Sequence, residues 1–204
     1  MKRSKLKRSL VDEIAEAIQV GEYRADEWLR QVDLEEKFQA TRFDVRSALE
    51  ALVVRKVVQH VPNRGYKVPS VDPEMSKHQR DVRVVVETAA APMIIKHVTD
   101  SDTTQLDKLA GEFAQAAKSG DHVDQSRTNR AFHEAMFNLT KNPVMVEIIW
   151  LIRDRGRSAP FTIWRSMDTL QQSVTEHQKM VEAIAARDAE ALAQLIEIHI
   201  RRPH

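Results

Sequence analysis

Three histidines in the second half of the chain have a spacing that suits a metal site. His133 follows Asn129 by four residues, so a helix places an imidazole and an amide oxygen on one face. His177 and His199 lie in two consecutive helical segments, and the predicted turn near residues 187–188 is ten or eleven residues from each. Because equal distances from a turn give equal depth in an antiparallel helix pair, the three imidazoles can converge on one site.

The residues around these histidines indicate that their side chains point inward. His177 keeps helical spacing with Val181, and His199 keeps it with Leu192 and Ile196. Neutral imidazoles suit Zn²⁺, Ni²⁺ or similar ions, and three of them leave positions open for water or an anionic ligand. The same spacing also fits histidines that are hydrogen-bonded within a core, so spacing alone leaves both interpretations open.

A different chemistry is predicted near the N-terminus, where residues 39–52 form a helix that presents two arginines. Thr41 can cap this helix and Asp44 completes a capping box, so the helix begins at Arg42. Arg42 and Arg46 share a face on which guanidinium groups can contact phosphates or guanine edges. A separate buried stripe consists of Val45, Ala48, Leu49 and Leu52. This pattern is typical of a DNA-reading helix.

Two further helices are expected before this one. The first spans residues 9–20, and a short one spans residues 33–38, where Asp33 and Glu36 form a second capping box. The segment between them is expected to be a loop in which Trp28 and Leu29 fill the core, although Trp28 could instead touch a partner. A helix so close before the arginine-bearing helix indicates a helix-turn-helix.

A β-hairpin is expected directly after the arginine-bearing helix. Two β-prone runs, residues 57–61 and 66–68, flank a Pro/Gly turn with Arg64 near its tip. A hairpin in this place is a wing whose tip can reach a groove or a phosphate. Residues 1–69 are therefore predicted to form a winged helix-turn-helix domain.

These motifs resemble the N-terminal domain of GntR-family transcription regulators. The resemblance is carried by Thr41-Arg42, by Val45-Arg46-x-Ala48-Leu49-x-x-Leu52 and by Arg64-Gly65-x-x-Val68. Phe43 and Asp44 stand where Thr-Pro is common in the family. The resemblance implies binding to double-stranded DNA, with contacts from Thr41, Arg42, Arg46, Arg64 and Gly65.

The remainder of the chain, residues 70–204, is predicted to be an all-helical antiparallel bundle, which makes the fold mainly α. Pro69 and Pro73 mark the change of domain. Helices are expected at residues 74–98, 102–118, 122–140, 143–155, 168–187 and 188–202. Pro92 should kink the first of them, and its inward-facing residues are expected to be Val82, Val85, Val86, Ala89 and Met93.

This second domain resembles the FCD effector domain that follows many GntR-type DNA-binding domains. The motifs are Arg83-x-x-x-Glu87, Asn129-x-x-Phe132-His133, Asn142-Pro143, Glu176-His177-x-x-Met180-x-x-Ala183-Ile184, Asp188 and His199. The resemblance implies a divalent metal held by an Asp and three His beneath a pocket for a small carboxylate. Asn129 takes the place of the Asp, and His133, His177 and His199 match the histidines.

Asn129 departs from the family pattern, which has Asp at this position, and the difference has a chemical consequence. An amide oxygen can ligate a metal but carries no charge, so the ion keeps its full positive charge. The missing charge should weaken binding of the metal ion to the protein and strengthen the ion's attraction for an anionic effector. The alternative is a metal-free polar pocket in which the histidines themselves bind the effector.

Arginines in the second domain are candidates for binding that effector. Arg83 can pair with a carboxylate through its guanidinium fork, or it can form a salt bridge with Glu87 on a solvated face. Arg130 and Arg153 can play the same part as Arg83.

Composition limits the remaining possibilities. The chain has no cysteine, which excludes disulfides and thiolate sites, and no apolar run approaches the roughly 20 residues that span a bilayer. A cytoplasmic protein without membrane partners is expected. Residues 1–69 carry 14 Lys and Arg against 11 Asp and Glu, and the excess lies in residues 1–8, which are either an arm for phosphate contact or a solvated terminus.

The combined prediction is a homodimeric, ligand-responsive transcription regulator, with repression favoured, that binds a palindromic operator. One alternative is a metal-dependent enzyme. Glu134 and Glu176 adjoin two of the histidines, but adjacent helical residues point about 100° apart, so neither is expected to act as a general base. The other alternative is a DNA-binding module whose helical bundle serves only dimerisation.

Overall fold

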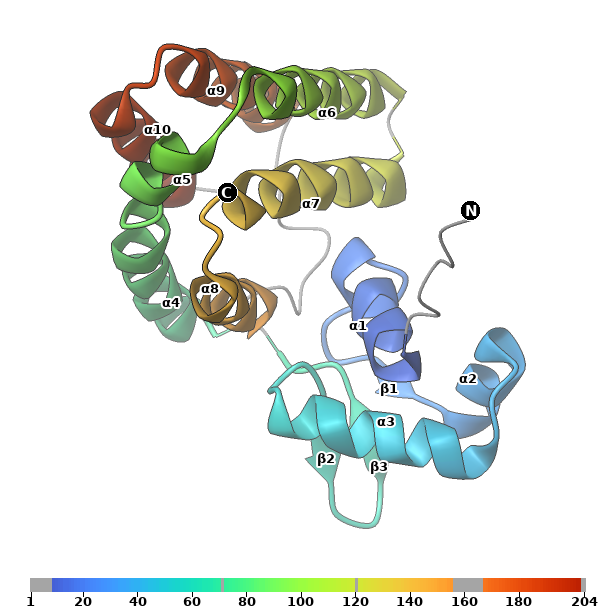
Figure 1. Ribbon diagram of the computed structural model, residues 1–204. Coiled ribbons are helices and arrows are strands. Elements are labelled where there is room, and N and C mark those ends of the chain that lie inside the picture. The colour runs from blue at the N-terminus through green and yellow to red at the C-terminus, as the bar shows by residue number, and fades with distance from the viewer. Residues whose placement is uncertain (1–8, 71, 120, 156–166, 203–204) are drawn as a thin grey trace, which may run out of the picture. The chain divides into compact units, whose positions relative to one another are not determined.

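The computed structural model describes residues 9–70, 72–119, 121–155 and 167–202. The chain divides into two compact units, and the boundary between them lies at residues 71–72. Each unit has its own hydrophobic core. Figure 1 shows the helices and strands of both units. The basic N-terminal segment, residues 1–8, lies outside the described residues.

The first unit consists of three helices and a small sheet. Its elements are α1 (Leu10–Val20), β1 (Trp28–Leu29), α2 (Gln31–Phe38), α3 (Arg42–Val54), β2 (Gln59–Val61) and β3 (Gly65–Lys67). The strands are antiparallel in the order β1-β3-β2. Strands β2 and β3 form the predicted hairpin, which confirms the wing.

Helix α3 begins at Arg42, as predicted. The hydroxyl of Thr41 accepts a hydrogen bond from the backbone N–H of Asp44 at 3.2 Å and donates to the Asp44 carboxylate at 2.6 Å. The predicted stripe of Val45, Ala48, Leu49 and Leu52 is fully buried against α1, α2 and the sheet. The core therefore holds α3 by one face and leaves the arginine face in solvent.

Two expectations for the segment before α3 are wrong. Helix α2 starts at Gln31, and its N-cap is Arg30, which makes no side-chain cap, so Asp33 and Glu36 do not form a capping box. The segment expected to be a loop contains β1, whose Trp28 and Leu29 pair with β3. This pairing fixes where α2 begins. Leu29 is buried as expected, but Trp28 is 41% exposed and does not fill the core.

The described part of the second unit forms seven helices. They are α4 (Pro73–Thr88), α5 (Ala91–His97), α6 (Asp100–Ser119), α7 (His122–Asn138), α8 (Pro143–Arg155), α9 (Met167–Ala185) and α10 (Ala189–Arg201). Helix α6 packs against α7 and α9, and α4 packs against α8 and α10 (Figure 1). The predicted mainly α fold is confirmed. The expected kink before Pro92 is a break that separates α4 from α5.

The inward face predicted for α4 is wrong in part, since Val86 packs against the core and Met93 is half-buried, but the other three members do not face inward. Val82, Val85 and Ala89 are exposed, whereas Val84 and Glu87 are buried. The apolar periodicity misplaced the inward face because a carboxylate, Glu87, occupies a core-facing position. Its partner is an arginine far away in the sequence, described below.

Candidate functional site

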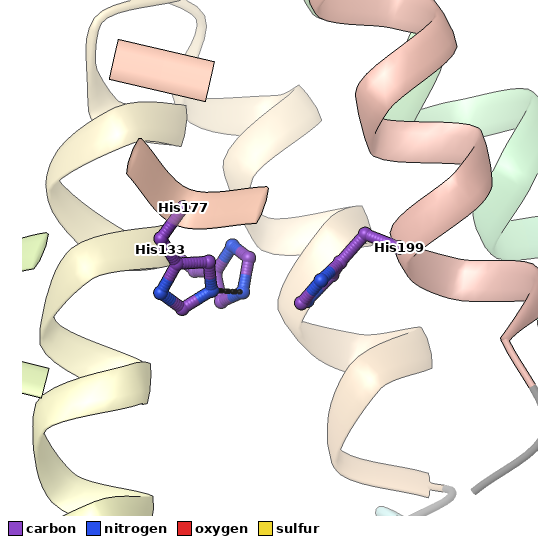
Figure 2. A group of neighbouring side chains, drawn as sticks. All are labelled: His133, His177 and His199. Atoms are coloured by element: carbon purple, nitrogen blue, oxygen red, sulfur yellow. Dashed lines mark hydrogen bonds between the residues drawn. The ribbon is translucent and has the colours of Figure 1, made fainter. Parts of the chain in front are cut away.

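The structure brings together the three histidines that the sequence analysis selected. His133 extends from α7, His177 from α9 and His199 from α10 (Figure 2). All three side chains are buried. One ring nitrogen from each lies within 4.8 Å of the others. The Nε2 atoms of His133 and His177 are 3.3 Å apart. Two neutral imidazoles at this distance either share one proton or direct both lone pairs toward a common cation.

Local sequence explains why the histidines meet. Asp188 caps α10 through a 2.9 Å hydrogen bond from the backbone N–H of Ala191, and Arg187 has a φ of 58°, so the chain reverses sharply between α9 and α10. Helices α9 and α10 then pack side by side. Phe132 stacks on the His177 ring, with a centroid distance of 4.3 Å, and limits its movement.

Burial keeps these histidines uncharged. It lowers the pKa of His133 and His177 well below the ordinary value, and the nearby positive charge of Arg153 adds to the effect. Burial and Arg153 likewise lower the pKa of His199, to about 3. Near neutral pH the three imidazoles are therefore neutral, which is the form that binds a metal ion.

A carboxylate orients His199. The Nδ1–H of His199 donates a hydrogen bond to Oε2 of Glu176 at 2.7 Å, so its Nε2 remains available to the cluster. Arg202 forms an ion pair with the same carboxylate. The expectation that Glu176 points away from the site is wrong. A rotation of about 100° from His177 directs Glu176 toward α10 rather than into solvent. Glu134 is exposed, as expected.

The amide oxygen of Asn129 fits a role as a ligand. Asn129 lies one turn before His133 on α7 and is buried, and its Oδ1 has no hydrogen-bond partner among the described residues. The Nδ1 atoms of His133 and His177 are also buried without such a partner. Because buried polar atoms are normally satisfied, this concentration of unsatisfied atoms indicates a site for a cation or a small polar ligand.

Two arginines and one carboxylate lie close to the histidines. Arg153 holds Glu87 in a two-pronged ion pair, with both N–O distances at 3.0 Å, and Arg83 contacts the same carboxylate at 2.7 Å. Burial raises the pKa of Glu87, but the two guanidinium groups outweigh it and lower the pKa to about 2. The pair of Arg83 with Glu87 expected on a solvated face is therefore present, but its carboxylate is buried. Arg130 instead pairs with Asp154 at 3.0 Å.

The other predicted site lies on the first unit. Thr41, Arg42 and Arg46 are exposed on α3. Arg46 is held by Glu50 at 3.0 Å, whereas neither Arg42 nor Arg64 has an ion pair among the residues that the structure describes. Gly65 has a φ of 107°, a conformation that favours glycine, and so lets the chain turn into β3 behind Arg64.

Sequence reasoning missed the surroundings of Arg64. Its guanidinium carbon lies 5.8 Å from the centre of the Trp28 ring, close enough for a cation–π contact. Trp28, Arg42 and Arg64 line a hollow of about 270 Å³. The only signal available in the sequence was a tryptophan outside any apolar stripe.

Comparison with protein families identifies both units. Residues 6–68 match the family model described as bacterial regulatory proteins of the gntR family, and residues 80–202 match the FCD domain model. The chain is a gntR-family regulator with an FCD domain. This regulator is therefore a DNA-binding transcription regulator, and the enzyme alternative is set aside because both families are regulators.

Known proteins similar to this FCD regulator cover almost its whole length. The HTH-type transcriptional regulator McbR of Escherichia coli K12 is 21% identical over 206 residues, with 98% of this chain and 93% of McbR covered. The HTH-type transcriptional repressor GlaR of the same organism is 23% identical over 192 residues, with 90% and 87% covered.

Solved structures show the same fold. That of E. coli McbR/YncC has a TM-score of 0.86 at 20% identity and covers 94% of this regulator and 92% of its own chain. A GntR regulator from Rhodococcus sp. RHA1 has a TM-score of 0.77 at 20% identity, with 94% and 91% covered. Among the described residues of this regulator, no helix is long and apolar enough to cross a membrane.

Proposed function

We propose that this regulator is a ligand-responsive repressor that senses a small carboxylate at a divalent metal ion. The observation that carries the proposal is the cluster of three buried, neutral imidazoles, each with a ring nitrogen within 4.8 Å of a ring nitrogen of the other two. His133, His177 and His199 would hold the metal, with Asn129 as a neutral fourth ligand. Three nitrogens and one amide oxygen suit Zn²⁺ or Ni²⁺. The bound ion would supply a positive charge that attracts an anion.

The charges of the protein around this cluster also favour an anion. Arg83 and Arg153 bring two positive charges, and Glu87 neutralises one of them. Asn129 adds no negative charge. Arg83 contacts Glu87 through its Nε, so its two terminal nitrogens can donate hydrogen bonds to the effector carboxylate. Arg130 is a weaker candidate for this role because Asp154 already pairs with it.

In this proposal α3 and the wing read a DNA operator through Thr41, Arg42, Arg46, Arg64 and Gly65. Neither Arg42 nor Arg64 has an ion pair with any residue that the structure describes, so the N–H donors of both guanidinium groups can serve phosphate or base contacts. Repression is the favoured direction, in keeping with the name of the relative GlaR.

A homodimer is part of the proposal. Val82 and Val85 on α4 are 48% and 69% exposed, and α8 exposes Val144, Ile148 and Leu151 along one face. Helices α4 and α8 pack against each other, so these side chains offer a surface for a second copy. A two-fold dimer presents one α3 to each half of a palindromic operator. Effector binding regulates DNA affinity if it favours one arrangement of the dimer.

Metal content and ligand-dependent stability test the proposal together. The full-length protein, purified without a histidine tag or chelator, should contain close to one Zn²⁺ or Ni²⁺ per chain. Its melting temperature should rise with some members of a panel of small carboxylates. A variant with His133, His177 and His199 all changed to Ala should lose the metal. Full metal retention in this variant would rule out the site.

A protein without metal whose melting temperature no carboxylate changes would contradict the sensor. That outcome would leave a DNA-binding dimer whose helical unit serves dimerisation alone. The proposed reading of DNA is tested separately. Arg46→Ala should abolish operator binding without unfolding the protein, and unchanged affinity would remove α3 from the interface.

A further inference from the structure

A large aromatic side chain stands in solvent on the proposed DNA-reading helix. Phe43 is the second residue of α3 and is 78% exposed. The folded chain therefore gains little from burying this ring, and a phenyl group left in water is available for a partner to cover. The residues on either side of it, Arg42 and Asp44, are exposed as well.

The place of Phe43 on the helix defines what that partner is. With about 100° between successive helical residues, Arg42, Arg46, Phe43 and Ser47 fall within an arc of about 140° that begins at Arg42, beside the buried stripe, and turns away from it. Phe43 thus belongs to the same outward face as the two reading arginines. In helix-turn-helix proteins the first residues of the recognition helix contact base edges in the major groove.

We propose that Phe43 reads thymine by packing its ring against the C5 methyl group in each half-site. In the major groove, guanine is read by arginine, whereas the thymine methyl is the apolar feature that an apolar side chain can contact. Arg42 and Arg46 supply the first kind of contact and Phe43 supplies the second. This inference rests on the proposed reader role of α3, and it adds a base preference to that role.

The test uses DNA that the protein itself selects. The full-length chain recovers duplexes from a random pool, and each thymine of the resulting half-site is then replaced by deoxyuridine, which removes only the methyl group. We expect one position per half-site at which this replacement weakens binding by about threefold to tenfold. In the Phe43→Ala variant the same replacement should have no effect, because the methyl has lost its partner.

Val54 offers a matched control. It is the last residue of α3 and is 80% exposed, so Val54→Ala removes an exposed apolar side chain from the far end of the same helix. This variant should bind the selected DNA with wild-type affinity. Replacement of thymine by deoxyuridine should weaken its binding as much as it weakens that of the wild type. Phe43→Leu should keep part of the thymine preference, since leucine also presents apolar surface.

Three results would overturn the inference. Wild-type binding could be unchanged by deoxyuridine at every position, or Phe43→Ala could show the same loss as the wild type. Alternatively, Phe43→Ala could change the oligomeric mass in solution and leave base preference intact, which would assign the ring to a second copy of the chain. Arg46→Ala separates this failure from that of the proposed function, because it should abolish binding whenever α3 reads DNA.

Discussion

Oε2 of Glu176 lies 2.7 Å from Nδ1 of His199, and this contact joins α9 to α10 beside the histidine cluster. The carboxylate selects the tautomer of His199 that keeps the Nε2 lone pair free. A metal-binding histidine usually donates its second N–H to such an acceptor, which fixes the ring and makes it a better ligand. Glu176 therefore prepares His199 without itself being one of the proposed ligands.

Glu176→Gln should lower the affinity for Zn²⁺ by about tenfold to a hundredfold, because the weaker acceptor no longer holds the His199 ring and tautomer. Competition titration with a chromophoric chelator measures this. Glu134→Gln is the control, since Glu134 adjoins His133 but is exposed. Equal affinities in the wild type and the Glu176 variant would show that the contact has no part in metal binding.

Asn129→Asp should strengthen metal binding by about tenfold or more, because a carboxylate neutralises part of the ion's charge. For the same reason it should weaken binding of the anionic effector. Calorimetric titration with Zn²⁺, followed by titration of the metal-loaded protein with the carboxylate found in the thermal screen, gives both numbers. If the substitution changes neither affinity, Asn129 does not contact the ion.

Glu87→Gln should destabilise the protein by about 3–5 kcal/mol, because it leaves Arg153 as a buried charge without its counterion. Urea unfolding gives the free energy. The matched control is Glu197→Gln on α10, which breaks an exposed pair with Arg201 and should cost less than about 1 kcal/mol. Similar losses in both variants would argue that the buried pair contributes no more than a surface one.

The same ion pair predicts how stability changes in acid. The pKa of Glu87 is about 2 in the folded protein and near 4.5 ordinarily, so between these values the unfolded chain binds a proton that the folded chain does not. The free energy of unfolding contributed by Glu87 is therefore complete above about pH 4.5 and is lost as pH falls toward 2. Glu87→Gln should flatten this part of the profile. A profile with the same slope in both proteins would assign the acid sensitivity to other groups.

Trp28→Ala should weaken operator binding by about twofold to fivefold, because Arg64 loses the ring that holds its guanidinium in place. If Arg64 contacts a phosphate, the dependence of affinity on salt should also become shallower. Trp28→Phe keeps an aromatic face and should restore most of the affinity. A loss of melting temperature in Trp28→Ala with unchanged salt dependence would instead indicate a purely structural role.

The parts of the structure that the sequence predicted well depend on local patterns. Helix α3 follows from its cap at Thr41 and its apolar stripe, and the wing follows from two β-prone runs around a turn. The proximity of His177 and His199 could be predicted from the position of the single turn between their two helices. Each of these depends on residues that are close together in the chain.

The predictions that failed depend on distant partners. Strand β1 has two residues and exists because β3 pairs with it, so no local periodicity marks it. The inward face of α4 is set by Glu87, whose partner Arg153 is 66 residues away. Glu176 faces the cluster because α10 lies on that side of α9. Helix pairing of this kind is not encoded in the spacing of a single helix.

If Arg46 reads DNA as proposed, its pair with Glu50 has a consequence for how the regulator searches a genome. Glu50 places a negative charge beside Arg46, so Arg46 would exchange a carboxylate for each new contact and would gain less from an arbitrary phosphate. Contacts with random sequence would then be brief. A guanine edge that accepts both prongs of the guanidinium would offset the exchange, so the protein would stay longest on its operator.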